Sequence, residues 1–313
     1  MTGPGARPHF GDRLAAAVTA RHSQIVLGLD PDPARLWPGA GDAAAGAGHT
    51  RTPAGAAAAA VEAHCRAVLD AVADVVVAVK PQLACFERLG APGRAALGRV
   101  TEHAQAAGLL VLADAKRGDI DVSALAYAQS LLGTTATPFG EVAGLGADAM
   151  TASPYMGTDT IAPLLRTARA VGAGVIVLVR TSNPGAADFE DLELASGGTV
   201  WEEVARRVDA LGEPGPESGL SDVGAVVGAT APQHVARLRA IMPSTPFLLP
   251  GVGAQGGRVE DLAPAFAPGP AGGLITASRS IVRAHEADGA SADPAAAARA
   301  EAERLRAVAW GLA

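Results

Sequence analysis

The 313-residue sequence contains few cysteines and few aromatic residues. Its two cysteines, Cys65 and Cys85, lack the spacing of metal ligands, and two thiols are too few for a disulfide framework in a chain of this length. We therefore expect reduced, mostly buried thiols and a cytoplasmic protein. Because 4% of the residues are aromatic while 49% are hydrophobic, the core must be built from Ala, Val, Leu and Ile.

The sequence also lacks features that direct a chain to a membrane or a nucleic acid. Met1–Phe10 has no basic stretch followed by an apolar one, so it predicts no signal peptide. Ala54–Val61 is too short to span a bilayer. A net charge of −7 and a pI of about 5.5 argue against non-specific binding to nucleic acid or anionic lipid, although a local basic cluster could still bind a small anion. The seven histidines are scattered, which disfavours a histidine metal site.

Short aliphatic runs that end in Gly, Pro or a polar residue recur along the chain. Most are continuously apolar, as expected for strands that are buried on both faces of a parallel sheet. The eight runs are Ile25–Leu29, Val75–Val79, Leu109–Ala113, Ala147–Thr151, Val175–Val179, Val223–Val227, Pro246–Leu249 and Gly273–Thr276. Helical patterns lie between them, at Val61–Val72, Arg94–Ala107, Ile161–Val171 and Pro232–Ile241. This alternation predicts a (β/α)₈ TIM barrel, with a doubly wound open sheet as the alternative.

Three segments rich in Gly, Pro or Ala interrupt this alternation, at Pro38–Gly55, Pro184–Gly219 and Ala263–Gly272. We interpret them as loop insertions in one barrel domain, residues 1–313, because no self-contained set of elements follows any of them. Asp293-Pro294 marks the start of a closing helix over Asp293–Leu312.

Polar residues follow most of the predicted strands. In a barrel of this kind the active site lies at the carboxyl ends of the strands. The residues at these ends are Asp30, Lys80, Asp114, Lys116, Ser182, Gln255 and Arg279. Any one of them could be a turn residue, as Asp30 in Asp-Pro-Asp-Pro illustrates, but together they favour a polar site.

The third strand end carries Asp114 and Lys116, which are two residues apart and should point the same way on an extended backbone. Gly118 then allows a turn before Asp119. With Lys80 nearby, the charges alternate in sign, and a lysine between carboxylates stays protonated. Such a lysine suits proton donation better than nucleophilic attack; the alternative is an ion-pair network that stabilises the barrel rim.

A second group follows the seventh strand. Pro250–Gly257 contains a GxGxxG match, but the segment where a dinucleotide site needs an acidic residue, Pro264–Gly272, is not a strand. We interpret the match as a loop whose backbone N–H groups approach a phosphate, with Gln255 as a side-chain donor. Arg279 follows the eighth strand and offers a planar fork to phosphate oxygens. Phosphate sites after strands 7 and 8 recur in barrels, so the expected substrate is a small phosphate monoester.

These motifs resemble a known family. Asp114-Ala-Lys116-Arg-Gly-Asp119-Ile120 is similar to the DxKxxDI signature of orotidine 5′-phosphate decarboxylases. The resemblance extends to Leu27-Gly-Leu-Asp30-Pro, Val79-Lys80-Pro-Gln, Ser153-Pro-Tyr-Met-Gly157, Arg180-Thr-Ser182-Asn-Pro184, Pro250–Gly257 and Ser278-Arg279-Ser-Ile281. The lysine-proline-glutamine sequence that begins at Lys80 and the length of the chain resemble those of the longer bacterial subgroup of this family.

The resemblance implies a role for each matching residue. Lys80, Asp114, Lys116 and Asp119 would form the charged tetrad, in which Lys116 protonates C6 of the pyrimidine and Asp114 lies beside the departing carboxylate. Asp119 would reach the site of a second subunit, which implies a homodimer with shared active sites. The residues expected to bind orotidine 5′-monophosphate are Asp30 and Lys80 at the ribose, Ser182 and Pro184 at the pyrimidine, Gln255 and Arg279 at the phosphate, and Ser123 after the signature. The reaction, which forms UMP in pyrimidine biosynthesis, would need no cofactor and no metal.

Two other functions stay open at this point. A Mg²⁺-dependent sugar-phosphate decarboxylase of the same structural group would also carry a DxKxxD run, but it would place an acidic metal ligand where this chain has Lys80. A non-catalytic barrel that binds a phosphate ligand would not need four alternating charges.

Overall fold

The computed structural model describes residues 7–41 and 52–313. Eight parallel strands close into a barrel in the order β1-β10-β9-β8-β7-β6-β3-β2, which confirms the (β/α)₈ prediction and excludes the open sheet. The barrel strands are β1 (Ile25–Leu29), β2 (Ala78–Pro81), β3 (Leu110–Arg117), β6 (Ala149–Ala152), β7 (Gly174–Arg180), β8 (Val223–Val227), β9 (Phe247–Leu249) and β10 (Gly273–Ala277). Each of these strands overlaps one of the predicted runs.

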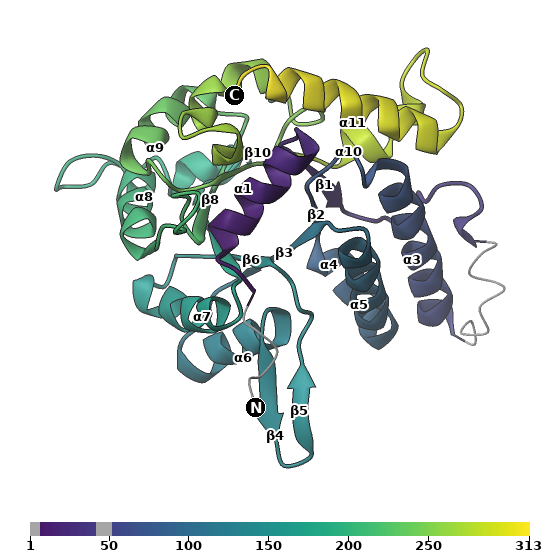
Figure 1. The fold of residues 1–313 in the computed structure, drawn as a ribbon, viewed down its shortest axis with the longest axis horizontal. Coiled ribbons are helices and arrows are strands. Elements are labelled where there is room, and N and C mark those ends of the chain that lie inside the picture. The colour runs from purple at the N-terminus through teal and green to yellow at the C-terminus, as the bar shows by residue number, and fades with distance from the viewer. Residues whose placement is uncertain (1–6, 42–51) are drawn as a thin grey trace.

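Helices surround the barrel (Figure 1). They are α1 (Phe10–Arg21), α3 (Pro53–Val72), α4 (Leu83–Glu87), α5 (Gly90–Ala106), α6 (Asp121–Leu131), α7 (Thr158–Ala170), α8 (Val200–Leu211), α9 (Val235–Ile241), α10 (Arg279–Val282) and α11 (Pro294–Trp310). The predicted closing helix is confirmed: Asp293 caps α11 by accepting a hydrogen bond from the Ala295 N–H, and Pro294 takes the first helical position. No helix in the described ranges is both long enough and apolar enough to cross a membrane.

The core has two parts, because successive strand residues point to opposite faces. One part fills the barrel interior, where Phe10, Leu14 and Val18 of α1 pack with inward residues such as Leu112 and Ile176. A Cβ at Gly174, the first residue of β7, would lie 2.5 Å from the Phe10 ring, so α1 closes the amino end of the barrel. The other part lies between the strands and the outer helices. The carboxyl end of the barrel is therefore the end left open for a ligand.

The prediction that Pro184–Gly219 is a loop is wrong, because α8 lies inside this segment. Trp201, Ala205 and Val208 are buried at the spacing of one helix face, and Thr199 and Glu202 form a capping box at the start of α8. The many acids of Pro184–Gly219, together with the glycines that flank α8, obscured this pattern.

The structure of two other predicted loop insertions also differs from the prediction. Ala263–Gly272 is mostly 3₁₀ structure, in η3 (Val259–Phe266) and η4 (Pro270–Gly272), rather than a plain loop. The end of Pro38–Gly55 is helical because α3 begins at Pro53, while residues 42–51 of that prediction, like residues 1–6 of Met1–Phe10, lie outside the described residues.

A β-hairpin also has no counterpart in the sequence predictions. The strands β4 (Thr134–Thr137) and β5 (Gly140–Ala143) form an antiparallel hairpin that extends away from the barrel beside α6 (Figure 1). The hairpin is almost entirely exposed and has the fully exposed Phe139 at its turn. Its lack of a buried face explains why no alternating apolar pattern marks it.

Candidate active site

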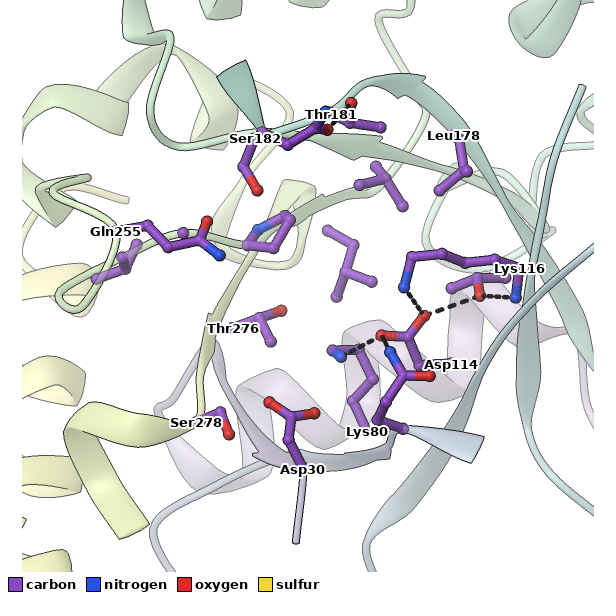
Figure 2. Close-up of a pocket in the computed structure, with 18 of the residues that line it drawn as sticks. Asp30, Lys80, Asp114, Lys116, Leu178, Thr181, Ser182, Gln255, Thr276 and Ser278 are labelled. Carbon is purple, nitrogen blue, oxygen red and sulfur yellow. Dashed lines mark hydrogen bonds and ion pairs between the residues drawn. The ribbon is translucent and has the colours of Figure 1, made fainter. Parts of the chain in front are cut away.

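A cavity of about 450 Å³ opens at the carboxyl end of the barrel (Figure 2). All eight barrel strands, or the loops that follow them, contribute lining residues. Leu178, Val226 and Leu248 give the cavity an apolar floor. The polar lining residues are Asp30, Lys80, Gln82, Asp114, Lys116, Thr151, Thr181, Ser182, Asn183, Gln255, Thr276, Ser278 and Arg279. The site therefore combines an apolar floor with a polar wall.

Asp114 lies between two lysines, as predicted. Lys80 Nζ donates to Asp114 Oδ2 at 2.5 Å, and Lys116 Nζ donates to Asp114 Oδ1 at 2.5 Å. The two carboxylate oxygens therefore each bind a different ammonium group, and Figure 2 shows the three side chains along one side of the cavity. Asp114 and Lys80 are buried, whereas Lys116 extends its ammonium into the open part of the site.

The pKa of Asp114 lies below its usual range. Burial by itself would raise this pKa, but the charges of Lys80 and Lys116 and their hydrogen bonds outweigh it. Asp114 is consequently ionised at neutral pH, and it provides a negative charge between the two ammonium groups.

The backbone of Lys116 is unusual for a residue inside a strand. Its φ is +47°, in the left-handed region that costs a non-glycine residue about 1–2 kcal/mol. The pairing of β3 with β6 shifts register here, since Ala113 pairs with Met150 and Arg117 pairs with Ala152. This bulge places Lys116 over the cavity.

The opposite side of the cavity carries the residues predicted to bind phosphate. Gln255 lies across the cavity from Lys116 (Figure 2), and Arg279 is the first residue of α10. Neither side chain forms a hydrogen bond or an ion pair within residues 7–41 and 52–313. Both therefore keep donors that face solvent and cavity.

The loop between Gly251 and Gly257 differs in detail from its prediction as a set of bare N–H donors. The N–H groups of Gly253, Gly256 and Gly257 donate to carbonyls of the same loop, at 2.8 to 3.0 Å. Gly251, Gly253 and Gly256 have φ values of +100°, +74° and +90°. These glycines therefore serve first to shape a tight turn that presents Gln255.

Ser182 and Asp30 also line the cavity as predicted, whereas three predicted site residues do not. Asp119 is partly buried and accepts a hydrogen bond from the Ile120 N–H at 2.8 Å, outside its own chain's cavity. Ser123 is exposed on α6, and Pro184 is exposed at the start of η1. Their roles stay predictions.

Several lining residues were not among the predicted site residues. Gln82 donates to Asp114 Oδ2 at 3.2 Å, and Thr151 donates to Asp114 Oδ1 at 3.1 Å. Gln82 lies two positions after Lys80, so the alternation of an extended chain could have identified it. Thr151 is the last residue of the predicted run Ala147–Thr151, so its place at a strand end could have identified it.

Known proteins match almost the whole chain. The family described as "Orotidine 5'-phosphate decarboxylase / HUMPS family" matches residues 23–300. The chain belongs to this orotidine 5′-phosphate decarboxylase / HUMPS family.

Relatives named orotidine 5′-phosphate decarboxylase share about two fifths of the aligned residues. The Rhodopirellula baltica protein is 40% identical over 278 residues, which cover 88% of this chain and 89% of that protein. The Deinococcus radiodurans protein is 41% identical over 300 residues, 94% and 97% of the two chains. The solved OMP decarboxylase of Leishmania donovani has 33% identity and a TM-score of 0.69, over 96% of this chain and 99% of that one. Members of the orotidine 5′-phosphate decarboxylase / HUMPS family thus share both the sequence and the barrel of this chain.

Proposed function

We propose that this chain decarboxylates orotidine 5′-monophosphate to UMP and carbon dioxide, a step of pyrimidine biosynthesis. The observation that carries the proposal is the row of Lys80, Asp114 and Lys116, which faces a cavity with Arg279 and Gln255 on its other side. The names of the curated relatives support the same activity. A cytoplasmic location stays a prediction from the sequence.

The two sides of the cavity suit the two ends of the substrate. The phosphate would bind Arg279 and Gln255, since a guanidinium group and an amide donate to phosphate oxygens. Ser182 would donate to the pyrimidine edge, with Pro184 near it, and Asp30 and Lys80 would bind the ribose hydroxyls. The C6 end of the ring would then point to Lys116, with Ser123 beyond the signature segment.

Lys116 is placed to complete the reaction. When the bond between C6 and the carboxylate breaks, its electron pair stays on C6, and the Lys116 ammonium supplies the proton that C6 needs. A fixed ammonium stabilises this developing charge because Asp114 already holds it in place before the bond breaks. Asp114 would lie beside the departing carboxylate, and phosphate contacts far from C6 would help to orient the ring. This route uses the chain's own residues and needs no cofactor.

The same proposal includes a homodimer with shared active sites. Asp119 lies outside its own cavity, and exposed apolar side chains occur on the segments that follow the neighbouring strands β3, β6 and β7. They are Ile120, Val122, Leu125, Tyr155, Met156 and Phe189, with Val122 81% and Tyr155 88% exposed. An apolar rim beside a site is typical of a protein interface. A second copy that covers this rim would bring its Asp119 to the cavity.

The Mg²⁺-dependent sugar-phosphate decarboxylase is the alternative within the family. Its chemistry needs carboxylate oxygens that are free to bind a metal, whereas both oxygens of Asp114 bind ammonium groups and the second strand end carries Lys80. Lys80 would repel a divalent cation. The residues present therefore do not fit a metal at this position.

Turnover decides between these functions. The purified chain, with EDTA and no added metal, should convert orotidine 5′-monophosphate to UMP. The change in absorbance spectrum between substrate and product and the release of carbon dioxide measure this conversion. Turnover only of a keto-sugar phosphate with Mg²⁺ would establish the alternative. Binding of UMP without any turnover would instead identify a phosphate-binding barrel.

The dimer has its own test. Lys116→Ala and Asp119→Ala chains should each be inactive, but their mixture should regain about a quarter of wild-type activity, because half of the pairs are mixed and each mixed pair holds one intact site. A mixture as inactive as its parents would reject shared sites.

A further inference from the structure

Thr151 connects the two residues that the proposed reaction uses most directly. Its hydroxyl oxygen Oγ1 accepts a hydrogen bond from the Lys116 backbone N–H at 2.8 Å and donates one to Asp114 Oδ1 at 3.1 Å. Figure 2 shows both bonds as dashed lines that reach Lys116 and Asp114. One hydroxyl on β6 therefore contacts the backbone of the lysine and the side chain of the aspartate at the same time.

The bond to Lys116 lies where the bulge interrupts the pairing of β3 with β6. The register shift between Ala113 and Arg117 breaks the regular ladder at this point. The Lys116 N–H donates to the Thr151 hydroxyl of β6 instead of to a backbone carbonyl. Since Lys116 has a φ of +47°, its conformation persists only if surrounding contacts hold it.

The second hydrogen bond of Thr151 holds the Asp114 carboxylate. Asp114 Oδ1 binds both Lys116 Nζ and the Thr151 hydroxyl. Thr151 is 1% exposed, so water cannot substitute for its hydroxyl, and its branched side chain has few rotamers. Gln82 also donates to Asp114, but among the described residues the Lys116 N–H bonds to Thr151 and not to Gln82.

We infer that Thr151 is a positioning residue, which holds the strained Lys116 backbone and the Asp114 carboxylate in the arrangement needed for proton transfer to C6. This inference rests on the proposed decarboxylation. Thr151 does not itself exchange a proton with the substrate in this scheme. It orients Lys116, whose ammonium group donates the proton.

The test compares Thr151→Val with Thr151→Ser. Valine has the shape of threonine but cannot accept from Lys116 or donate to Asp114, so kcat for orotidine 5′-monophosphate should fall about 10- to 100-fold, while KM changes less than about threefold. Serine keeps the hydroxyl and should restore kcat to within about fivefold of wild type. Thr101→Val is the matched control, since Thr101 is equally buried on α5, its hydroxyl has no partner among the described residues, and turnover should be unchanged.

Two results would overturn the inference while leaving the proposed function intact. One is a Thr151→Val enzyme with wild-type kcat. The other is a crystal structure of that variant in which Lys116 keeps its positive φ and its contact with Asp114. Should Thr151→Val fail to fold, by circular dichroism, Thr151→Ala and Thr151→Ser carry the same comparison of kcat with KM. A wild-type chain that does not decarboxylate the substrate at all would reject the proposed function and this inference together.

Discussion

A buried aspartate lies between two cationic side chains at both ends of this barrel. At the carboxyl end Asp114 binds Lys80 and Lys116, and at the amino end Asp148 binds Arg7 and Arg13. Both carboxylates are almost completely buried. The two clusters are therefore alike in charge and in burial of the acid.

They differ in what else the cations contact. Arg7 also donates to the carbonyls of Val171 and Ala147, and Arg13 also donates to the carbonyl of Gly172. Among the described residues, the ammonium groups of Lys80 and Lys116 donate only to Asp114, and Lys116 keeps 46% of its side chain exposed beside the cavity. At the amino end, backbone carbonyls accept the remaining hydrogen bonds of the arginines, so that cluster has a structural role. At the carboxyl end, the lysines face a cavity, so their ammonium groups are available to a ligand.

Removal of the Lys116 ammonium should cause the largest loss of turnover. It should also distinguish the ion cluster at the carboxyl end of the barrel from the one at the amino end most clearly. Lys116→Ala should lower kcat at least about 10³-fold, because the proton donor and a fixed charge are lost together. The melting temperature should change little. Arg13→Ala, at the amino end, should lower the melting temperature and keep turnover. Turnover by Lys116→Ala within tenfold of wild type would refute its role as proton donor.

The isosteric Asp148→Asn change should act on stability alone. It removes the charge that Arg7 and Arg13 share, so the free energy of unfolding should fall by about 2 kcal/mol, while kcat of the folded protein stays within twofold. Urea denaturation measures the first quantity. Asp74→Asn, in the exposed pair with Arg299, is the control and should cost less than about 1 kcal/mol. A loss of kcat without a loss of stability would contradict the assigned structural role.

The phosphate side of the cavity should respond in binding rather than in stability. Arg279→Ala should raise the Kd for UMP about 10- to 100-fold, because a charged hydrogen bond to phosphate is lost. Isothermal titration calorimetry measures this affinity. Arg283→Ala, four residues further and outside the main cavity, should change the Kd less than about threefold. Equal effects of both variants would show that only the overall positive charge matters.

A smaller effect of pH should come from His64, beneath the loop that follows β1. Burial lowers the pKa of His64 to about 4, and its Nδ1 accepts a hydrogen bond from the Trp37 N–H at 3.0 Å. Between pH 6.5 and about 4, the unfolded chain binds a proton here that the folded chain does not, so the free energy of unfolding falls as the pH falls.

From pH 7 to pH 5 this loss should be about 1–2 kcal/mol by urea denaturation. His64→Gln, which can still accept from Trp37, should show a smaller dependence over the same interval. An identical pH dependence in the variant would assign the effect to other groups.

The strands and most of the site residues could be predicted from the sequence. β1 and β8 match their predicted limits, because continuous aliphatic runs bounded by polar residues are distinctive. Asp30, Lys80, Ser182 and Arg279 could be predicted because the carboxyl ends of barrel strands converge. Helix α8 and the β4–β5 hairpin could not, since the first lies in an acidic, glycine-flanked segment and the second buries almost nothing.

The sequence by itself determined the eight alternating strand and helix units and the alternating charges at the strand ends, since both follow from local patterns along the chain. The tertiary structure decided that the strands close into a barrel instead of an open sheet. The tertiary structure alone decided that Lys116 adopts a positive φ, which no propensity of lysine favours. It also paired that residue with Thr151, which is 35 positions away. A bulge is defined only by the pairing of one strand with its neighbour. The orientation of the Lys116 side chain therefore depends on β3 and β6 together.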